Sequence, residues 1–568
     1  MLHHHGAHGQ AGATETGNAG MGAHADTATG RVRPVMPEDL YRRSGTDPEL
    51  NARAKRPMTL VRARRARRTL VACLVALIAV LACLTAGSSR TVGLASDGTG
   101  DGSITIALKL APVSLDIRRQ SGSALEQILI GNVYESLVSR GTDNKVHPGL
   151  AYDWDVSQDG LTYTFRLNQR MRFSNGDTLD AEDVVWSLEE LRARGYYNHE
   201  QIEALDHVEA LDANTVRLTL SRPDSNLLWY LTGRCGLVYD KDGVWDERSG
   251  ALGSGPYQVV SFDPNDRIVL RADPHYWGED HRAAVGNVVI RFISDENAAV
   301  NALSSGDAQI VTPVSSTLAE PLRDDPRYAV TEVEGSDKFV LAFNMADPVL
   351  KDARIRKAIR HAIDHGQIIA ARGGVDTALG GPIPATDPGY EDLTGLYPHD
   401  VAQARTLMRQ AGYTTEHPLA LTLTYANTYG TDIGDQLASQ LASIGIDLEV
   451  RVVEFSTWLQ DVHTNGDYQL SLVDHAESHD FYKWTDPDYY YHYDNAEVRD
   501  LYAKALASVD EEQASDYLAR AARLVSEDAP ADWLFGWRVV AVAAADVRGL
   551  PDRLIQSTLP LWRLSYAS

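Results

Sequence analysis

The sequence predicts an α/β protein, and two patterns support this prediction. Short segments rich in β-forming residues, such as Leu161–Leu167 with its alternation of apolar and polar residues, have the period of a half-buried strand. Longer segments, such as Asp352–Asp364 with Ile355, Ile359 and Ile363 on one face, have the period of an amphipathic helix. Because the two kinds alternate along most of the chain, they predict helices packed on a sheet. At 568 residues the chain is too long for one hydrophobic core, so we expect two or three domains.

The N-terminal segment has the composition of a leader rather than of a folded domain. Residues 1–57 are rich in His, Gly, Ala and Thr and lack a hydrophobic period, which predicts a disordered extension. We expect Met58 to be the physiological start, with residues 1–57 upstream of it; the alternative is a disordered cytoplasmic tail. Residues 58–82 combine a cluster of arginines with the short apolar run Leu70–Ala82, as in a signal peptide.

Cys83 directly follows this apolar run, in a stretch that resembles a bacterial lipobox. It is therefore the predicted lipidation site, with residues 83–102 as the lipidated cysteine and a polar, Gly-rich tether. This predicts an extracytoplasmic protein, anchored as a lipoprotein to the outer face of the cell membrane or periplasmic. The alternative is an uncleaved anchor, because the run through Gly87 reaches about 18 residues. Arg67 and Arg68 leave open whether export is by the Sec or the twin-arginine route.

The chain is strongly acidic, with a formal net charge of −25. Without residues 1–83, which hold 12 of the 53 basic and 6 of the 78 acidic residues, the net charge is −31. Such a surface argues against a nucleic-acid partner, which needs basic patches to neutralise phosphates. It favours cationic or zwitterionic ligands over anions, or it is a solvated surface with no meaning for ligands.

Cysteine use indicates a fold held by packing alone. Beyond Cys83 the exported part contains only Cys235, so no internal disulfide is expected. No Cys/His spacing typical of a metal site is present, and no cofactor is expected.

The first half of the exported chain predicts a strand at Ser103–Leu110 and a helix at Ala124–Val138. The strand Leu161–Leu167 leads to a tight turn at Asn175-Gly176. Asp180, with Asp183 three residues later, then begins a helix with acidic residues at its positive end.

The next segments predict a hairpin and further αβ pairs. Gly253–Tyr257 reads as a Gly-Pro turn feeding strands at Gln258–Phe262 and Arg267–Arg271, with Tyr276 and Trp277 closing it. Helices are expected at Asp352–Asp364, at Ala402–Tyr413 with Gly412 as terminator, at the start of Leu437–Val452 before a strand, and twice within Asn495–Pro530.

In their residues and in their order along the chain, these segments resemble the family 5 extracellular solute-binding proteins. These are the oligopeptide-, dipeptide- and nickel-binding subunits of ATP-driven (ABC) importers. The resemblance is carried by residues 148–188, by Gly253–Tyr257 with Asp273–Trp277, by Phe343-Asn344 with Asp352–Asp364, and by Ala411–Tyr413. It extends from about Ser103 to about Trp562. It implies a two-lobed periplasmic-binding-protein fold of type II, peptide-binding cluster, with an extra domain inserted in the first lobe.

The resemblance also implies domain boundaries. Lobe I would comprise residues 101–147, 251–340 and 540–568, the extra domain residues 148–250, and lobe II residues 341–539. Crossings near Val340 and Val540 would form the hinge about which the lobes close on ligand.

Peptide-binding relatives carry an aspartate for the peptide's ammonium group in the region that corresponds here to Asp467–Asp494. This chain departs from their pattern, because the expected tryptophan is missing and the acid is displaced. The resemblance implies Asp480 as the ammonium partner, then Glu477, then Asp474. Trp484, Tyr489 and Tyr491 would wall side-chain pockets, or belong to a core strand and a surface loop. Leu115, Asp116 and Ser123 would face the cleft from the first lobe.

His475 and His479, four residues apart, are weak candidates for a metal site, and we expect none. No nucleophile elbow, HExxH motif or P-loop is present, so an enzyme is not expected. The predicted function is the capture of short peptides and their delivery to the transmembrane subunits of an ABC permease, by a monomer bound to the membrane through its lipid. The alternatives are the same fold binding a metal chelate, opine or oligosaccharide, a receptor or adhesion lipoprotein, and a cell-wall peptide hydrolase.

Overall fold

The computed structural model describes residues 102–120, 122–555 and 557–567. The predicted extension, the signal peptide, Cys83 and nearly all of the tether lie outside the described residues. Within the described ranges, no helix is both long enough and apolar enough to cross a bilayer.

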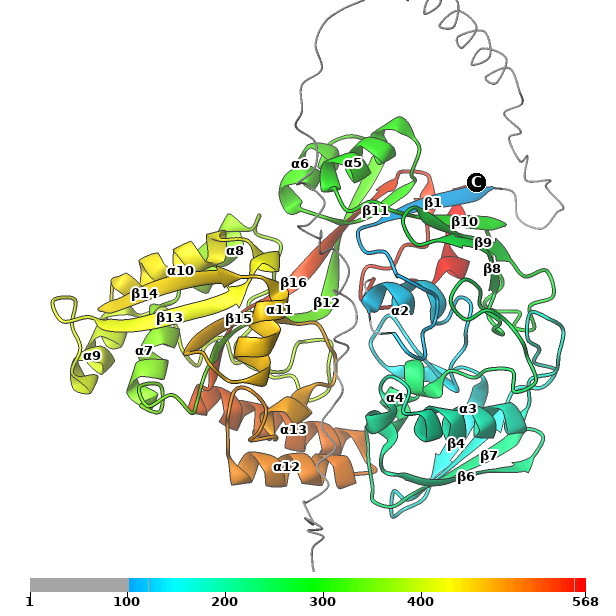
Figure 1. Ribbon diagram of the computed structural model, residues 1–568, viewed down its shortest axis with the longest axis horizontal. Helices are drawn as coiled ribbons and strands as arrows, with labels where there is room; N and C mark the ends of the chain where they lie inside the picture. The colour runs from blue at the N-terminus through cyan, green and yellow to red at the C-terminus, as the bar shows by residue number, and fades with distance from the viewer. Residues whose placement is uncertain (1–101, 121, 556, 568) are drawn as a thin grey trace, which may run out of the picture. The chain divides into compact units, whose positions relative to one another are not determined.

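A ten-stranded sheet, with strand order β14-β13-β15-β12-β16-β11-β1-β10-β9-β8, forms the framework of the chain from Ser103 onward. One half, here called lobe I, contains β1 (Ser103–Leu108), β8 (Tyr257–Asp263), β9 (Arg267–Ala272), β10 (Asn287–Phe292) and β11 (Ile310–Val314), with helices α5 (Glu296–Ser305) and α6 (Ser316–Arg323). The other half, lobe II, contains β13 (Leu419–Ala426), β14 (Ile446–Val453) and β15 (Leu470–His475). Two long strands, β12 (Tyr328–Phe343) and β16 (Ala531–Ala544), belong to both halves (Figure 1).

The two long strands pair antiparallel with each other, and their register shifts between Glu334 and Lys338. On the lobe I side of this shift β16 also pairs with β11, and on the lobe II side β12 also pairs with β15. The chain therefore crosses between the lobes at the shift. Val340 and Val540, the predicted crossing points, lie in paired stretches on either side of it.

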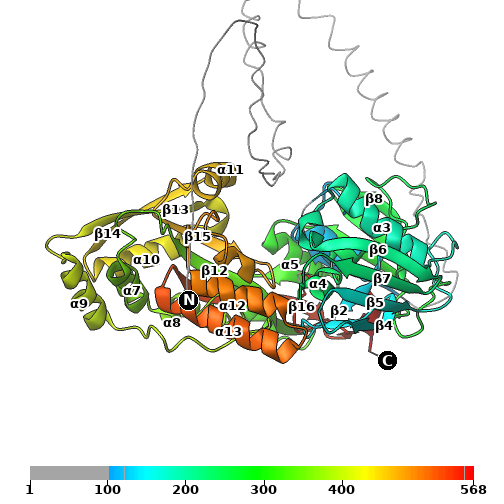
Figure 2. The ribbon, with the colours of Figure 1, turned by 90° about the horizontal axis from the view of Figure 1, so that it is seen from below.

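A second, four-stranded sheet has the order β4-β5-β7-β6. Its strands are β4 (Ala151–Val156), β5 (Thr162–Leu167), β6 (Leu205–Asp212) and β7 (Thr215–Leu220), and helix α3 (Ala181–Arg194) lies beside it (Figure 2). The sheet and helix share a core that includes Phe165, Val184 and Leu218. These elements fall within residues 148–250, the range predicted for the extra domain.

Helix α3 begins as the sequence predicts. The Glu182 N–H donates to Asp180 at 2.9 Å, and the Asp180 N–H donates to the Asp183 carboxylate at 3.0 Å. This reciprocal pair satisfies two of the backbone donors that a helix start leaves without partners. The adjacent turn has Gly176 at φ 96°, which favours glycine.

The predicted helix over Ala124–Val138 is wrong in its length, because α2 ends at Leu129 (Ser123–Leu129). Gly131 then adopts φ 73°, and Asn132 exchanges hydrogen bonds with Leu559 and Leu561 near the C-terminus. The apolar period continues beyond the helix because the following turns also bury their apolar side chains. Two short strands come next, β2 (Val138–Arg140) and β3 (Val146–Pro148).

The predicted hairpin forms from β8 and β9, and its aromatic closure is built on Glu135. The Tyr276 hydroxyl donates to the Glu135 carboxyl at 2.7 Å, the Trp277 indole N–H at 2.9 Å and the Ser254 hydroxyl at 2.8 Å. Burial raises the pKa of Glu135 to about 7, while these three donors oppose the shift.

Helices cover the sheet in lobe II. The predicted helices form as α7 (Ala353–Ala362), α9 (Val401–Ala411), α10 (Asp432–Ala442), α12 (Ala496–Ala507) and α13 (Glu511–Asp528). Gly412 ends α9 at φ 98°, as its position predicts. Lobe II also contains the shorter helices α8 (His365–Ala371) and α11 (Phe455–Trp458).

Outside lobe II, α4 (Leu227–Tyr230) is a short helix on the lobe I side, and a small sheet joins β17 (Val547–Arg548) to β18 (Ser565–Tyr566).

Candidate functional site

A cavity of about 1410 Å³, here called the interlobe cavity, is lined by residues of both lobes. Its lining on the lobe I side includes Ser123, Glu135, Arg140, Tyr197, Trp229 and Trp562. Lobe II contributes residues 476–479 and Tyr482, and β12 contributes Ser336 and Asp337 where the chain crosses between the lobes. Since pockets for drug-sized ligands occupy about 300–1,000 Å³, this cavity has room for a larger solute.

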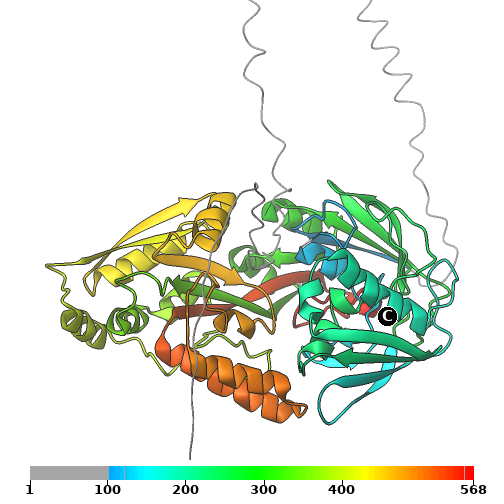
Figure 3. The same cartoon turned by 60° about the horizontal axis from the view of Figure 1, so that its bottom comes forward.

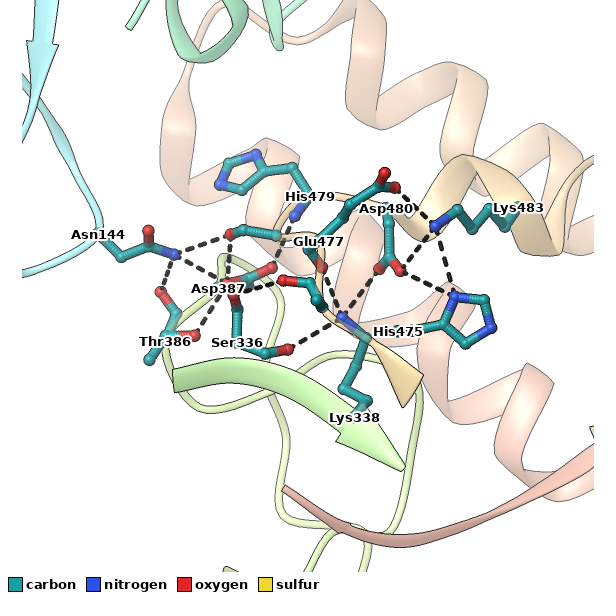
Figure 4. Close-up of polar contacts among 12 residues, drawn as sticks. Asn144, Ser336, Lys338, Thr386, Asp387, His475, Glu477, His479, Asp480 and Lys483 are labelled. Atoms are coloured by element: carbon teal, nitrogen blue, oxygen red, sulfur yellow. Dashed lines mark hydrogen bonds and ion pairs between the residues drawn. The ribbon is translucent and has the colours of Figure 1, made fainter. Parts of the chain in front are cut away.

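The lobe II wall is the segment that follows β15, within the range predicted to contact ligand. Ala476 and Glu477 are exposed at its tip, and the chain then turns back into a short helical turn at Phe481–Trp484. Figure 4 shows the charged side chains of this segment converging on Lys338 of β12 and on Lys483.

Asp480 is neutralised within the protein. It is 5% exposed and lies 3.2 Å from the Lys338 ammonium and 3.4 Å from the Lys483 ammonium (Figure 4). Burial opposes its ionisation, but the two lysines hold the pKa of Asp480 below its ordinary value. Asp480 is not among the residues that line the interlobe cavity.

The other two predicted carboxylates differ from each other. Glu477 lines the cavity, with its side chain 62% exposed and 2.7 Å from the Lys483 ammonium. Asp474 is outside the lining, its Oδ1 atom has no hydrogen-bond partner among the described residues, and burial raises its pKa well above the ordinary value.

The predicted aromatic residues lie in the core of lobe II. Trp484 and Tyr491 are 4% and 1% exposed and stack with ring centroids 4.6 Å apart. Tyr489 is half-buried and packs on Tyr490 and His475. None of the three lines the interlobe cavity. The aromatic side chains that line the cavity lie instead mostly on the lobe I side, and lobe II contributes Tyr482. Those on the lobe I side include Tyr197, Trp229, Tyr230, Tyr276, Trp277 and Trp562.

Of the residues predicted to face the cleft from the first lobe, Ser123 lines the cavity at the start of α2. Leu115 is 1% exposed in the core of lobe I, and Asp116 is half-buried beside Arg119, 2.9 Å away. The two residues are outside the cavity lining.

His475 and His479, the two candidate metal ligands, make contacts with different residues. His475 is buried against the hydroxyl of Tyr491, and burial lowers its pKa well below the ordinary value. His479 stacks on Trp229. Within the described part of the chain, no group of three or more His, Cys, Asp and Glu side chains is placed to hold a metal ion.

The lobes also contact each other directly at one side of the cavity, a feature that the sequence does not reveal. The Asn144 amide, in the loop between β2 and β3, donates to the Thr386 carbonyl at 3.0 Å, to Asp387 at 2.9 Å and to Ser478 at 2.9 Å (Figure 4). Nearby, Ser225 donates through its N–H to the Leu506 carbonyl of α12 at 2.9 Å. Figure 3 shows α12 and α13 as the pair of orange helices at the bottom of the view.

Asp337 is a second residue that sequence reasoning missed. It lines the cavity from β12, is 5% exposed, and its pKa is raised to about 7 by burial. Asp337 lies in a polar stretch of β12 that carries no motif, and its place in the cavity follows only from the crossing of the two long strands.

Three comparisons with known proteins bear on this site. The profile described as bacterial extracellular solute-binding proteins, family 5 Middle, matches residues 145–500. Di/tripeptide-binding protein 2 of Pseudomonas aeruginosa is 26% identical over 403 residues, which are 65% of this chain and 75% of that protein.

Solved structures share the fold. DppA of Helicobacter pylori, a periplasmic binding protein in complex with the peptide STSA, has a TM-score of 0.67 at 23% identity and covers 82% of this chain and 98% of its own. NikA of Brucella suis, in complex with Fe(III)-EDTA, has a TM-score of 0.73 at 22% identity and covers 82% and 100%. These likenesses confirm the predicted two-lobed, type II periplasmic-binding-protein fold.

Proposed function

Because the chain belongs to the bacterial extracellular solute-binding proteins of family 5, we propose that it captures short peptides between its lobes and delivers them to an ABC permease. Members of this family are extracytoplasmic proteins that bind substrates for ABC importers. The finer assignment, to peptides, has support from the likeness to di/tripeptide-binding protein 2 and to DppA in its complex with a peptide, and from the cavity.

The observation that carries the proposal is the large cavity lined by both lobes. A volume of about 1410 Å³ suits an extended ligand of several residues better than a single small metabolite. Its aromatic lining on lobe I offers apolar surface for side chains, and the exposed carboxylate of Glu477 offers lobe II a charge for a cationic group. Ser123, at the start of α2, supplies a hydroxyl to the same space.

The proposed mechanism is a population shift between open and closed lobes. A ligand that contacts both walls of the cavity stabilises the closed arrangement by the difference between its affinities for the two states. The long strands β12 and β16 are the only strands that both halves of the described sheet share, so the change of angle falls on the register shift between Glu334 and Lys338. The closed form is then the one that the permease receives.

The anchoring residue of this proposal is Cys83. Acylation there would hold the protein at the membrane surface beside its permease, since several acyl chains bind firmly where one binds marginally. The test is the mass of the N-terminal peptide of the membrane-extracted protein. A diacylglyceryl cysteine at its first position supports the anchor, and an unmodified or uncleaved N-terminus removes it.

Native mass spectrometry tests the peptide assignment. The purified protein is measured alone and after incubation with an equimolar mixture of random di- to pentapeptides. Bound masses that match peptides and are released on denaturation support the proposal and give the ligand length. A bound metal complex or sugar would reassign the ligand, and no bound species in either condition would reject capture of short peptides.

A further inference from the structure

Asp337 occupies a special position in the interlobe cavity. It lies on β12, within the register shift between Glu334 and Lys338, where the chain passes from one lobe to the other. It is 5% exposed and lines the cavity together with its neighbour Ser336. The carboxylate is therefore nearly removed from bulk water but is in contact with the space where a solute would lie.

No cation of the described chain forms an ion pair with this carboxylate. Apart from its own backbone N–H, no group in the described part of the chain donates a hydrogen bond to Asp337 or forms an ion pair with it. A buried carboxylate without a cation is costly, because its ionised form loses hydration without compensation. Groups of this kind are expected where a ligand completes the site.

The two cations that act on Asp337 are already engaged. The Lys338 ammonium donates to Asp480 at 3.2 Å, to the Ser336 carbonyl at 3.2 Å and to the Glu477 carbonyl at 2.7 Å. An ammonium group has three donors, so this set uses all of them.

Arg140, on the lobe I side, is engaged in part. Its Nε–H donates to Asn144 at 2.7 Å, and its guanidinium lies 4.5 Å from the centroid of the Trp229 ring. Both cations lower the pKa of Asp337, yet burial dominates and raises it to about 7. Neither cation forms an ion pair with the Asp337 carboxylate in the described chain, although the Arg140 Nη2 atom has no hydrogen-bond partner there.

We propose that Asp337 binds the primary ammonium group of the captured solute. The inference rests on the proposed function, under which this group is the amino terminus of a peptide. The solute's ammonium supplies the charge-assisted hydrogen bond that the protein withholds.

The assignment distinguishes Asp337 from the acidic residues of lobe II. Asp480 has two lysines and no place in the cavity lining, and Asp474 is outside the lining. Glu477 lines the cavity but is paired with Lys483 and well exposed, where an ion pair contributes little. Because Asp337 lies on a crossing strand, the ammonium group would be held before either lobe moves.

The test compares Asp337→Asn with Asp206→Asn in the full-length protein. Asp206 of β6 is an exposed aspartate outside the cavity lining, so it is a matched control. Each protein is incubated with a mixture of di- to pentapeptides and, separately, with the same mixture N-acetylated. Retained peptide is quantified by mass spectrometry.

We expect the wild type and Asp206→Asn to retain free-amino peptides at least tenfold better than acetylated ones, and Asp337→Asn to lose this preference. A preference that survives in Asp337→Asn, or equal retention of both mixtures by the wild type, overturns the inference. If the wild type retains no peptide from either mixture, the proposed function fails and a second measurement decides on Asp337.

That measurement is the melting temperature of the ligand-free proteins at pH 5 and pH 8. Folding raises the pKa of Asp337 from the ordinary value of 3.8 to about 7, so stability is lost progressively as the pH rises from about 4 to 7, and the loss is complete above pH 7. The gain in melting temperature of Asp337→Asn over the wild type should therefore be larger at pH 8 than at pH 5. A lower melting temperature at pH 8 would mean that the protein itself already supplies the cation, and would overturn the inference whatever peptides do.

Discussion

The imidazole ring of His479 lies flat on the indole ring of Trp229, with centroids 4.0 Å apart and 4° between the ring planes. Trp229 belongs to α4 on the lobe I side, and His479 follows β15 in lobe II. With the Asn144 hydrogen bonds beside it, this stack forms a contact between the lobes that needs no ligand. Closure of the cavity is thus partly encoded in the protein, and a solute has to supply only the remainder of the closing free energy.

Removal of the Asn144 amide should open the lobes of the ligand-free protein. Asn144→Ala removes an amide whose two N–H groups reach three acceptors of lobe II, a net loss of about 2 kcal/mol at about 1 kcal/mol per hydrogen bond, and so shifts the equilibrium toward the open state. Small-angle X-ray scattering should show a larger radius of gyration. The control is Asn265→Ala, an exposed residue in the β8–β9 turn, which should leave the radius unchanged. An unchanged radius in Asn144→Ala would mean that the contact does not limit opening.

His479 should make stability depend on acidity. Burial lowers its pKa to about 4, so it stays neutral in the folded protein while the unfolded chain takes up a proton near the ordinary value of 6.5. Stability contributed by the neutral ring is present above pH 6.5 and is lost as the pH falls toward 4.

The variant His479→Phe keeps a ring on Trp229 but removes this titration. Its melting temperature should fall less than that of the wild type between pH 6.5 and pH 4.5. His275→Phe, at an exposed site, should follow the wild type. Parallel curves for His479→Phe and the wild type would rule out a neutral, buried His479.

Binding of free-amino peptides should itself depend on pH in a bell shape. Below pH 7 an ammonium group must displace the proton of Asp337, so the affinity should fall about tenfold per pH unit. Above about pH 8 the peptide's own amino group loses its proton, and the affinity should fall again. Lys338 of the same strand, Arg140 of β2 and Asp474 of β15 are the charged groups that act on Asp337, and they shift the acidic limb without removing it.

Isothermal titration calorimetry from pH 5 to pH 9 checks this profile, with N-acetylated peptides as the reference. The acidic limb should be absent in Asp337→Asn and present in Asp206→Asn. A flat profile for the wild type would contradict the role of an ionisable carboxylate in the site.

Asp480 should matter for stability more than for ligand. Asp480→Asn leaves Lys338 and Lys483 without their shared carboxylate in a buried position, which costs about 3 kcal/mol. Urea denaturation should show the loss, while Glu477→Gln, which breaks a mostly exposed pair, should cost less than about 1 kcal/mol. Equal stability of Asp480→Asn and the wild type would contradict a buried triad.

Local signals in the sequence predicted the elements well where one residue type has one physical role. Asp180 and Asp183 at a helix start, Gly412 at a helix end and the Gly-Pro turn before β8 are of this kind. The end of α2 was mispredicted because the turns beyond it bury apolar residues with the same period as a helix.

The candidate site was less predictable because partners distant in the sequence define it. Nothing near Asp480 in the chain indicates that Lys338 neutralises it, and nothing near Asp337 indicates that no residue does. Trp484 and Tyr491 have the composition of a ligand-binding wall, but they pack against Trp533 of β16, which closes the core of lobe II. Contacts between residues far apart in the chain decide whether these side chains bind ligand or pack in the core. A single sequence has no local pattern that indicates such contacts.

The place of β16 in the sheet bears on how the protein reaches its folded state. This strand lies between β12 and β11, so until residues 531–544 join, the ten-stranded sheet is divided into two incomplete parts with open edges. Contacts such as Val340 with Trp533 link residues almost 200 positions apart, a topology that slows folding. A nascent chain that has not yet reached residues 531–544 therefore lacks the strand that completes both lobes, and it stays exposed to chaperones and proteases until those residues have emerged.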